Sequence, residues 1–596
     1  GCGGVGAAIQ AARSGARVIL IEETPWLGGM LTAAGVGATD GNHLLPSGIW
    51  GEFRQKLYNH YGGPKAVATG WVSHTLFEPK VGEAILSELA HAEPLLEIIH
   101  GYRPVDVIMK ENRVVGAVVI GEEKDTLRIT ASVTIDATEL GDVMAYAGAE
   151  YFTGIDTETD PHNVNIQDLT YAAIVKKYNK GQAPKAYPST NYDPIGFACL
   201  CQTVCRDTSR KSPPCDQMLE YAHMPKGKYM LNWPNNGNDY FVNVLNLPHE
   251  ARLKAYERAK ERTMDFLYFL QTEAGFPDLG LVTDEFPTED HLPLIPYHRE
   301  GRRLKGRVQL EVEDLQDPYR RDLYAYAISV GDYPLDHHHG KNPAIIRETF
   351  PDIPSFSIPY PALVPEKVEG LLVAEKGISV SHIVNGATRL QPCVMLTGQA
   401  AGAAAALAVR DHVQPRDVQI RALQQELLTA RCWLMPFFDV KPDDWYFEAV
   451  QKAGLSGIFK GHGLPYQWAN QTWFYPDSSL TRRELEDALA LARNEVPSAG
   501  NSVQAPPISR GEAVKIIWKM LGEPKNAPTE NAYEDVPPAD PLFAPLSHLR
   551  KKGWTQHWAG GKKFRPNEAL TRKEAAWLIE VIFSPFLRRP VPALAG

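Results

Sequence analysis

The first 22 residues combine two patterns of apolar side chains. Small and apolar residues run through GCGGVGAAIQAAR, with Ala8 where a helix would cross a sheet, and Gly15 follows this run. The apolar segment VILIE then ends at Glu22. A helix, a glycine turn and a buried strand ending in an acid are typical of a dinucleotide-binding βαβ unit. We therefore predict a helix, a strand and a dinucleotide site here; the alternative is a glycine-rich turn before an ordinary helix.

The glycines at the start allow two registers of the motif G-x-G-x-x-G. With Gly4 as the last glycine, Glu22 follows 18 residues later, close to the usual separation of about 20. With Gly6 as the last glycine, the helix would be too short. The Gly4 register makes Gly1 the second glycine, so we expect the first glycine and the first strand to precede this sequence. An acid at position 22 favours FAD or NAD over NADP, because it binds free ribose hydroxyls.

Apolar periodicity also predicts the later elements. RVVGAVVIG and TLRITASVTIDAT form a β-hairpin pattern, and EARLKAYERAKERTMDFLYFLQTEAG forms a helical one. We predict an α/β protein with a Rossmann-like dinucleotide-binding domain, an inserted substrate domain and a C-terminal α-helical repeat module. The predicted boundaries are 1–150 for the FAD-binding domain, 151–360 for the substrate domain, 361–410 for the return to the FAD-binding domain, 411–432 for a helical linker and 433–596 for the repeats.

Three separated segments indicate that the dinucleotide is FAD. Gly28 and Gly29 permit close approach of the backbone to a ligand. The strand SVTIDAT ends in a small turn, and Pro392 suits the first turn of an apolar helix whose N-terminus would stabilise the negative charge of reduced flavin at N1 and O2. The expected cofactor contacts are Gly1, Gly3, Gly4, Glu22, Gly28, Gly29, Met30, Ala137, Thr138, Gln391, Gly398 and Gly402.

Several ordered motifs resemble one known family. VEGLLVAEKGISVSHIVNGATRLQPCVMLTGQAAGAAAALA, IDATELGDVMAYAGAEYFTG, YHREGRRLKG and YPLDHHH are similar to segments of FAD-dependent oxidoreductases whose members often carry the name xanthan lyase. The resemblance covers about residues 1–410 and implies a Rossmann-like FAD-binding domain of glutathione-reductase type with an inserted β-rich substrate domain. FAD favours redox chemistry over a lyase reaction. A second G-x-G-x-x-G is absent from the sequence, so electrons would pass to oxygen, a quinone or a separate carrier rather than to a built-in NAD(P)H domain.

Candidate catalytic groups lie in two loops. Dehydrogenation of an alcohol needs hydride transfer to flavin N5 and a base for the hydroxyl proton, and histidine has the appropriate pKa. His382 is the first choice of base because the resemblance places its segment near the flavin ring, with Asn385 and Arg389 orienting substrate or stabilising charge. The alternative is that these groups cap a turn and pair with a structural carboxylate. In DHHHG, the resemblance places Asp336 and His338 toward the substrate.

The same loops raise the question of a metal. Three adjacent histidines cannot all face one ion from regular structure, so we predict no metal site.

The arginines of YHREGRRLKG either bind an anionic substrate or the FAD pyrophosphate, or form structural salt bridges. The cysteine spacing C-x-C-x3-C-x9-C matches no usual metal or iron–sulfur pattern, which favours buried free thiols or one disulfide. The three arginines are Arg299, Arg302 and Arg303, and the four cysteines are Cys199, Cys201, Cys205 and Cys215.

Composition excludes some partners. A net charge of −10 argues against a general nucleic-acid binder. The most apolar stretch, GQAAGAAAALAV, is too short to cross a bilayer, so we expect no membrane span. We expect the sequence to start inside its first domain, so the presence of a signal peptide is left open.

The last part of the sequence contains an internal repeat. FFDVKPDDWYFEAVQKAGLSGIF and AYEDVPPADPLFAPLSHLRKKGW are diverged copies, each followed by an aromatic-x-Pro element. They resemble S-layer homology repeats, which implies binding to a cell-wall polymer. Capping boxes explain the repeated spacing of Thr or Ser and Glu but not an arginine at the next position. The residues are Thr481, Glu484, Ser509, Glu512, Thr571 and Glu574, with Arg482, Arg510 and Arg572.

Together these patterns predict an extracytoplasmic or cell-surface FAD-dependent oxidoreductase. It would dehydrogenate a CH–OH or related group of a small-molecule or saccharide substrate, with a cell-wall polymer as a second partner. The alternative is a wall-associated or glycan-associated binding protein whose flavin fold is structural or inactive. A third interpretation is oxidation of amines or carbon–carbon bonds on the same fold.

Overall fold

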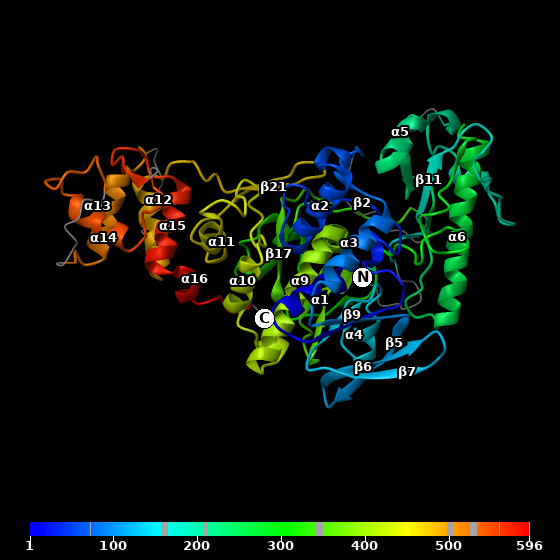
Figure 1. Ribbon diagram of the computed structural model, residues 1–596, viewed down its shortest axis with the longest axis horizontal. Coiled ribbons are helices and arrows are strands. Elements are labelled where there is room, and N and C mark those ends of the chain that lie inside the picture. Colours follow the sequence, from blue (N-terminus) through cyan, green and yellow to red (C-terminus); the bar gives the residue numbers. More distant parts are fainter. Residues whose placement is uncertain are drawn as a thin grey trace.

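The protein has a mixed α/β fold, seen in a computed structural model that describes residues 1–71, 73–155, 165–207, 209, 211–340, 350–497, 505–524, 533–558 and 561–594 (Figure 1). The α-helices of this part are α1 (Cys2–Arg13), α2 (Gly48–Tyr61), α3 (Pro79–His91), α4 (Asp142–Tyr146), α5 (Cys215–Glu220), α6 (His249–Thr272), α7 (Val312–Gln316), α8 (His382–Thr388), α9 (Gln391–Asp411), α10 (Ile420–Thr429), α11 (Phe447–Leu455), α12 (Arg482–Ala492), α13 (Arg510–Met520), α14 (Phe543–Lys551), α15 (Arg572–Phe583) and α16 (Pro585–Arg588).

The strands are short and belong to several small sheets. They are β1 (Val18–Glu22), β2 (Ala38–Thr39), β3 (Thr75–Leu76), β4 (Leu96–His100), β5 (Tyr102–Lys110), β6 (Arg113–Gly121), β7 (Thr126–Thr130), β8 (Thr134–Asp136), β9 (Tyr151–Phe152), β10 (Leu169–Thr170), β11 (Ala173–Lys177), β12 (His223–Met224), β13 (Lys228–Leu231), β14 (Asp239–Tyr240), β15 (Leu279–Leu281), β16 (Arg303–Leu304), β17 (Ala327–Gly331), β18 (Phe356–Pro359), β19 (Leu371–Val373), β20 (His462–Leu464) and β21 (Gln471–Trp473).

The first helix and strand form where the sequence predicts them. Gly1 is the N-cap of α1, and Gly15, at φ +91°, makes the turn into β1. β1 pairs in parallel with β4, which places Glu22 opposite His100. β8 pairs in parallel with β19, so segments far apart in the chain meet in one layer. The predicted helix, turn and strand are confirmed, while the strand expected before them stays a prediction.

α9 crosses α1 in the middle of the molecule at backbone contact (Figure 1). A Cβ on Gly398 would lie 1.9 Å from the carbonyl oxygen of Gly3, and a Cβ on Gly402 would lie 2.1 Å from that of Ala7. Only glycine permits this approach. Of the helices in the described ranges, α9 alone is long and apolar enough to cross a membrane, although 94% of its most apolar window is buried inside the fold. Its apolar surface therefore packs in the core.

Two antiparallel sheets flank this centre. β5, β6 and β7 form a three-stranded sheet, which confirms the predicted hairpin. β11, β12, β13 and β15 form a four-stranded sheet in the order β12-β13-β11-β15. The long helix α6, also predicted, packs near this second sheet at one end of the molecule (Figure 1).

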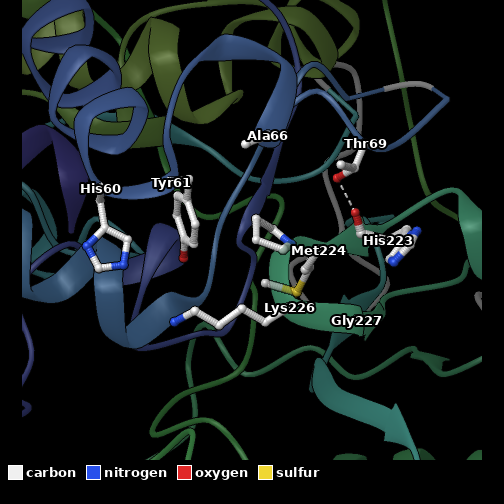
Figure 2. Close-up of a pocket in the computed structure, with 9 residues that line it drawn as sticks. His60, Tyr61, Ala66, Thr69, His223, Met224, Lys226 and Gly227 are labelled. Atoms are coloured by element: carbon white, nitrogen blue, oxygen red, sulfur yellow. Dashed lines mark hydrogen bonds between the residues drawn. The ribbon is translucent and has the colours of Figure 1, made fainter.

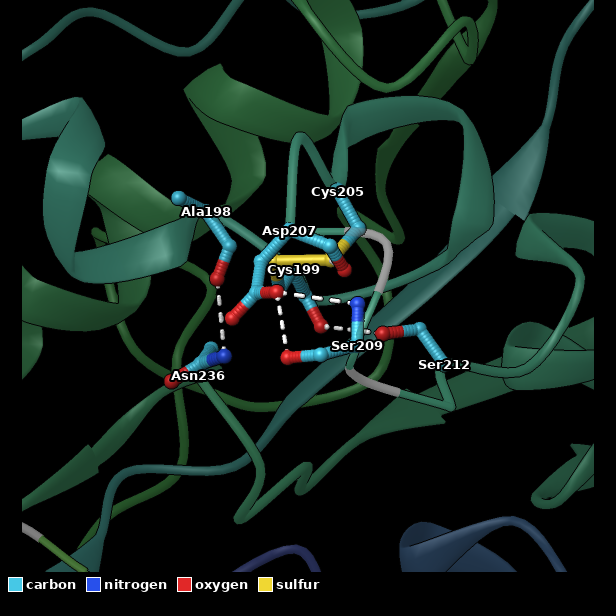
Figure 3. The surroundings of a disulfide bond; sticks show 7 residues. All are labelled: Ala198, Cys199, Cys205, Asp207, Ser209, Ser212 and Asn236. Carbon is cyan, nitrogen blue, oxygen red and sulfur yellow. Dashed lines mark hydrogen bonds between the residues drawn. A yellow bond between two sulfur atoms is a disulfide. The ribbon is translucent and has the colours of Figure 1, made fainter.

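Two disulfides, rather than one or none, hold the segment between β11 and α5. Cys199 is bonded to Cys205, and Cys201 to Cys215. Figure 3 shows polar contacts around the first bridge, where Ser212 Oγ donates to the carbonyl of Cys199 at 3.1 Å. The prediction of free thiols or a single bridge was therefore wrong, because pairing depends on how the chain folds back and not on spacing. Cys2, Cys393 and Cys432 are free and buried.

At the opposite end of the molecule, three helices start from one centre (Figure 1). Backbone hydrogen bonds run in a ring from Leu480 N to Leu570 O, from Leu570 N to Ile508 O and from Ile508 N to Leu480 O. The residue after each of these buried side chains is the N-cap of α12, α13 or α15. The three predicted capping boxes are all present, so the Thr or Ser and Glu residues stabilise helix starts around a pseudo-threefold ring.

The internal repeat is visible in its hydrogen bonds. The carboxylate of Asp439 accepts from the backbone N–H groups of Phe474 and Tyr475, at 2.9 and 2.7 Å. The carboxylate of Asp535 accepts in the same way from Phe564 and Arg565, both at 2.7 Å. Each aspartate thus ties one copy of the repeat to its aromatic-x-Pro element.

The end of the chain also contacts the first part of the protein. The Tyr326 hydroxyl, before β17, donates to the carbonyl of Pro592. The guanidinium of Arg421 in α10 lies 4.8 Å from the ring centroid of Phe586 in α16. The helical module is therefore joined to the α10 and β17 region by direct contacts as well as by the chain.

Candidate functional site

The start of α1 brings together residues from four segments. The backbone nitrogen of Gly1 lies 3.9 Å from Glu22 Oε2 and donates to the carbonyl of Ala137 at 3.3 Å. Gly29, at φ +52°, lies so close that a Cβ on it would be 2.6 Å from the Cα of Gly1. Thr24 N and Oγ1 both donate to Glu22 Oε1 at 3.1 Å, which orients the acid. The acid after β1, the glycine loop and the turn after β8 therefore meet where the sequence predicts a dinucleotide.

A buried carboxylate that the sequence did not indicate sits at the same helix start. Glu375 Oε2 accepts from Gly3 N at 2.7 Å, and Glu375 has a left-handed φ of +58°. Lys376 Nζ lies 3.3 Å from Glu375 Oε1 and also binds the carboxylate of Glu139. Burial raises the pKa of Glu375. Burial lowers the pKa of Lys376, but the two carboxylates raise it overall above its ordinary value.

The start of α9 is next to the start of α1. Cys2 Sγ lies 3.8 Å from the carbonyl oxygen of Gln391, the first residue of α9. Within the described ranges, no side chain caps this helix start. The buried Oε1 of Gln391 lacks a hydrogen-bond partner among the described residues. A helix N-terminus without a cap and an unpaired acceptor beside it suit a ligand with both an anionic group and an N–H donor.

These residues fit the two ends of FAD. Glu22 lies where it can bind ribose hydroxyls, the start of α1 donates to an anion, and Gln391 with the start of α9 suits the polar edge of the flavin ring. The Gly3 N–H that a phosphate would need is held by Glu375. The residues therefore fit FAD when the Glu375 carboxylate moves off this N–H.

The other predicted cofactor residues divide into two groups. Gly28 (φ +110°) and Met30 are buried in the glycine loop, and Thr138 donates to Asp136 from both its nitrogen and its hydroxyl. A Cβ on Gly4 would lie 3.0 Å from that of Ala137. Gly398 and Gly402 instead lie against the backbone of α1, so their small size serves helix packing; the expected contact with the cofactor is corrected for this pair.

His382 and Asn385 lie on α8, just before α9. His382 is buried, and its Nδ1 is 3.2 Å from Glu300 Oε1. Burial alone would raise the pKa of Glu300, but His382 and Arg303 hold it well below its ordinary value. Asn385 Oδ1 accepts from Gln167 Nε2 at 2.9 Å, while its buried Nδ2 has no partner among the residues that the structure describes. Glu300 thus orients the predicted base, and Asn385 keeps a donor for a ligand.

His338 and Arg389 meet at one carboxylate. His338 Nδ1 is 2.9 Å from Asp239 and its Nε2 is 3.2 Å from Asp336. Arg389 donates to Asp336 Oδ2 at 2.8 Å and to the Tyr297 hydroxyl at 2.7 Å. Burial lowers the pKa of His338, but the two carboxylates raise it overall. Both ring nitrogens of His338 are thus bound to carboxylates, and neither is left to accept a proton from a substrate.

Gln167 joins three of the four predicted catalytic residues, His338, Asn385 and, through Glu300, His382, into one network. Its Oε1 accepts from the backbone N–H of His338 at 3.2 Å, and its Nε2 donates to Asn385. Its own backbone N–H donates to Glu300 Oε2 at 3.1 Å. The structure therefore brings together the loop before β18, α8 and the segment after β15.

The loop histidines correct the argument against a metal. His337 and His339 flank His338 in irregular backbone, and their rings stack with centroids 5.5 Å apart, whereas the His338 ring contacts Asp239 and Asp336 instead. With His382 they form a cluster in which one ligand atom from each lies within 4.8 Å of the others. Burial lowers the pKa of His337 to about 3 and that of His339 to about 4. The prediction considered three adjacent residues and missed the pair that alternates.

The three arginines of YHREGRRLKG bind protein groups. Arg299 donates to Asp239 at 3.0 Å, Arg302 to Asp142 at 2.8 Å, and Arg303 Nε lies 3.3 Å from Glu300. Of the two roles that the sequence allows for them, the structural salt bridges are present.

A cavity of about 430 Å³ lies away from these residues (Figure 2). It is lined by the end of α2, with His60 and Tyr61, and by the turn from β12 to β13, with His223 and Lys226. None of the predicted site residues lines it. The lining of this cavity therefore does not connect it with the predicted redox chemistry.

Comparison with known proteins decides the family. The model of a family described as FAD dependent oxidoreductase matches residues 1–427. The chain belongs to this family. It is an FAD-dependent oxidoreductase, and FAD is its cofactor. A search of curated proteins finds no match to this oxidoreductase.

Three solved structures that are similar to the oxidoreductase each share 12% or less of its sequence. A geranylgeranyl bacteriochlorophyll reductase-like protein from Thermoplasma acidophilum is 12% identical, with a TM-score of 0.32 and coverage of 72% of this chain and 82% of that one. The quinol fumarate reductase of E. coli is 11% identical, with a TM-score of 0.28 and coverage of 98% and 87%. The p-nitrophenol 4-monooxygenase of Pseudomonas putida is 11% identical, with a TM-score of 0.27 and coverage of 76% and 92%. None of these likenesses carries an argument about the substrate.

Proposed function

We propose that this oxidoreductase dehydrogenates a CH–OH or related group of a carbohydrate-like substrate. The observation that carries the proposal is the His382–Glu300 pair, located beside the helix start that suits the flavin ring. FAD, when bound, accepts the hydride from the substrate carbon. The flavin part is proposed to have the Rossmann-like glutathione-reductase type of fold, with residues 151–360 as the substrate domain.

In this proposal Glu300 sets the protonation of His382. Its carboxylate accepts a hydrogen bond from Nδ1–H, which leaves Nε2 as the nitrogen that takes the hydroxyl proton. Asn385 Nδ2 supplies a donor for a substrate oxygen. Arg389, fixed by Asp336 and Tyr297, supplies positive charge near the same place. The residues together hold an alcohol and remove its proton.

A second part of the proposal concerns the helical module. We infer that residues 433–596 are S-layer-homology-like repeats that bind a cell-wall polymer outside the membrane. The repeated aspartate contacts and the ring of helix starts support a repeat. Two disulfides support an oxidising compartment. Arg510 pairs with Glu574 at 2.6 Å and Arg572 donates to the carbonyl of Phe474 at 2.8 Å, so of the three repeat arginines Arg482 has the most exposed side chain for a polymer.

The runner-up is a wall-binding protein whose flavin fold is inactive. Two observations favour it: the Arg482 side chain is exposed, and the Glu375 carboxylate at Gly3 competes with the cofactor. Members of the resembled family that carry the name xanthan lyase add a saccharide to the candidate substrates, without a residue here that selects it.

Anaerobic flavin reduction distinguishes the two. The purified full chain, loaded with FAD, is mixed with a panel of sugars, amines and unsaturated acids, and bleaching of the flavin absorbance is followed. We expect a sugar alcohol or aldose to bleach it and His382→Gln to slow bleaching by about 100- to 10,000-fold. His462→Gln, which removes an exposed histidine of β20, is the control. Flavin that no donor bleaches, in a chain that still binds wall polymer, would favour the runner-up.

A further inference from the structure

We propose that His337, His339 and His382 bind one divalent transition-metal ion, with Zn²⁺ as the expected ion. One ligand atom from each side chain lies within 4.8 Å of the others. His337 Nδ1 and His339 Nε2 are 3.3 Å apart. Two nitrogens bound to a tetrahedral Zn²⁺ at about 2.0–2.1 Å are themselves about 3.3 Å apart. This pair therefore already has the spacing of two ligands.

The outer contacts of these histidines are those of metal ligands. The Nδ1 of His382 lies 3.2 Å from Glu300, and the Nε2 of His337 lies 3.0 Å from the carbonyl of Ile383. A histidine that binds an ion usually donates its other ring N–H to a carboxylate or a carbonyl, which fixes the tautomer and the ring orientation. Glu300 is held in turn by the backbone N–H of Gln167. Two of the three rings are thus oriented to point a lone pair at one place.

The ligand set selects the class of ion. Three imidazoles without a thiolate suit Zn²⁺ and its neighbours, whereas Mg²⁺ and Ca²⁺ require oxygen ligands. His339 and His382 are buried, at 8% and 2% exposure. Three protein ligands leave a fourth tetrahedral position for water or a substrate oxygen, as in catalytic rather than structural sites. The competing interpretation is a hydrogen bond between two neutral imidazoles, with the His337 ring stacked on Phe350 at 4.9 Å.

The metal site extends the proposed function and changes one role in it. An ion on His382 takes the lone pair that would otherwise accept the hydroxyl proton. The substrate hydroxyl would then bind the ion, which lowers its pKa, and its proton would leave to solvent. The metal site and the direct base are therefore exclusive at this nitrogen, and metal binding can be measured without any substrate.

Metal titration of the full chain tests the inference. Protein without a histidine tag is dialysed against a chelator and titrated with Zn²⁺ by calorimetry, and with Co²⁺ by visible absorbance. We expect one ion per chain with a tetrahedral Co²⁺ spectrum, a loss of affinity of at least 100-fold for His339→Ala and for His382→Gln, and a loss of about 10- to 100-fold for Glu300→Gln.

The matched control is His338→Gln, in the same loop but facing Asp239 and Asp336, and it should keep the affinity. Circular dichroism shows whether each variant folds. A wild-type chain that binds no ion, or binding that survives both histidine substitutions, would overturn the metal site whatever the variants' stability. Flavin bleaching by a donor in the metal-free chain would still support the proposed function, so the two can fail separately.

Discussion

Replacing Glu375 by glutamine should strengthen FAD binding. The carboxylate lies 2.7 Å from the Gly3 N–H, the donor that a phosphate of the dinucleotide needs. Glutamine keeps the size of the side chain and removes its charge. The wild-type chain must move a charged group before FAD binds, while Glu375→Gln must only move a neutral one.

The size of the effect follows from the distance between the displaced Glu375 carboxylate and the phosphate of the dinucleotide. A carboxylate that leaves Gly3 but stays in the pocket would lie roughly 5 Å from the nearest phosphate charge, which corresponds to about 3 kcal/mol of repulsion at an effective dielectric constant of about 20. This equals about 100-fold in Kd. Lys376, 3.3 Å from the carboxylate, offsets part of the repulsion, so a tightening of about 10- to 100-fold is expected.

The sign of the pH dependence gives an independent check. Because burial raises the pKa of Glu375, this carboxyl gains a proton as the pH falls, and the repulsion disappears with the charge. FAD should therefore bind the wild-type chain more tightly as the pH is lowered, and Glu375→Gln should reduce that pH dependence.

Quenching of flavin fluorescence in flavin-free full chain measures both effects. Glu366→Gln, which removes an exposed carboxylate, is the control and should bind FAD as the wild type does. If Glu375→Gln bound FAD with equal or lower affinity, Glu375 would be a cofactor ligand and not a competitor, and the reasoning would fail.

Three more predictions test other parts of the structure. Arg389→Lys should lower kcat/KM for the donor about 100-fold at unchanged flavin content, because lysine cannot bridge Asp336 and Tyr297; equal activity would contradict the assignment. Burial raises the pKa of Asp332 to about 7, so the free energy of unfolding should fall by up to about 4 kcal/mol as the pH rises from about 4 to about 7, and Asp332→Asn, compared by urea unfolding at pH 5 and 8, should lose this fall. Gly402→Ala should destabilise the fold by about 1–3 kcal/mol in thermal unfolding, whereas Gly340→Ala, whose added Cβ meets no atom of the described residues within 4 Å, should be neutral.

Local pattern was enough to predict the elements around the cofactor. The small residues of α1, the turn at Gly15 and the acid at Glu22 follow rules that act over a few residues. The start of α9 follows from a proline in an apolar run. These features predicted that the two helix starts and Glu22 would meet, and the structure places them together.

The groups that sequence reasoning missed act across long separations. Glu375 reaches Gly3 over 372 residues, and Glu300 reaches His382 over 82, so no local pattern indicates either contact. The pairing of four cysteines is equally a property of the folded chain. The i, i+2 spacing of His337 and His339 could be seen in the sequence, and residues two apart can share one face of a chain. What lacked a signal was the third histidine.

The contacts of Pro592 and Phe586 with the first part of the protein limit how the two ends can move. If only a flexible linker joined the helical module to the rest of the protein, the active site could take any orientation relative to that module. Here Tyr326 and Arg421 contact the C-terminal residues Pro592 and Phe586, and these contacts restrict movement of the helical module. Under the proposed function, a polymer bound to the helical module would therefore hold the oxidoreductase in one orientation relative to that polymer, so that substrate would reach it from one direction.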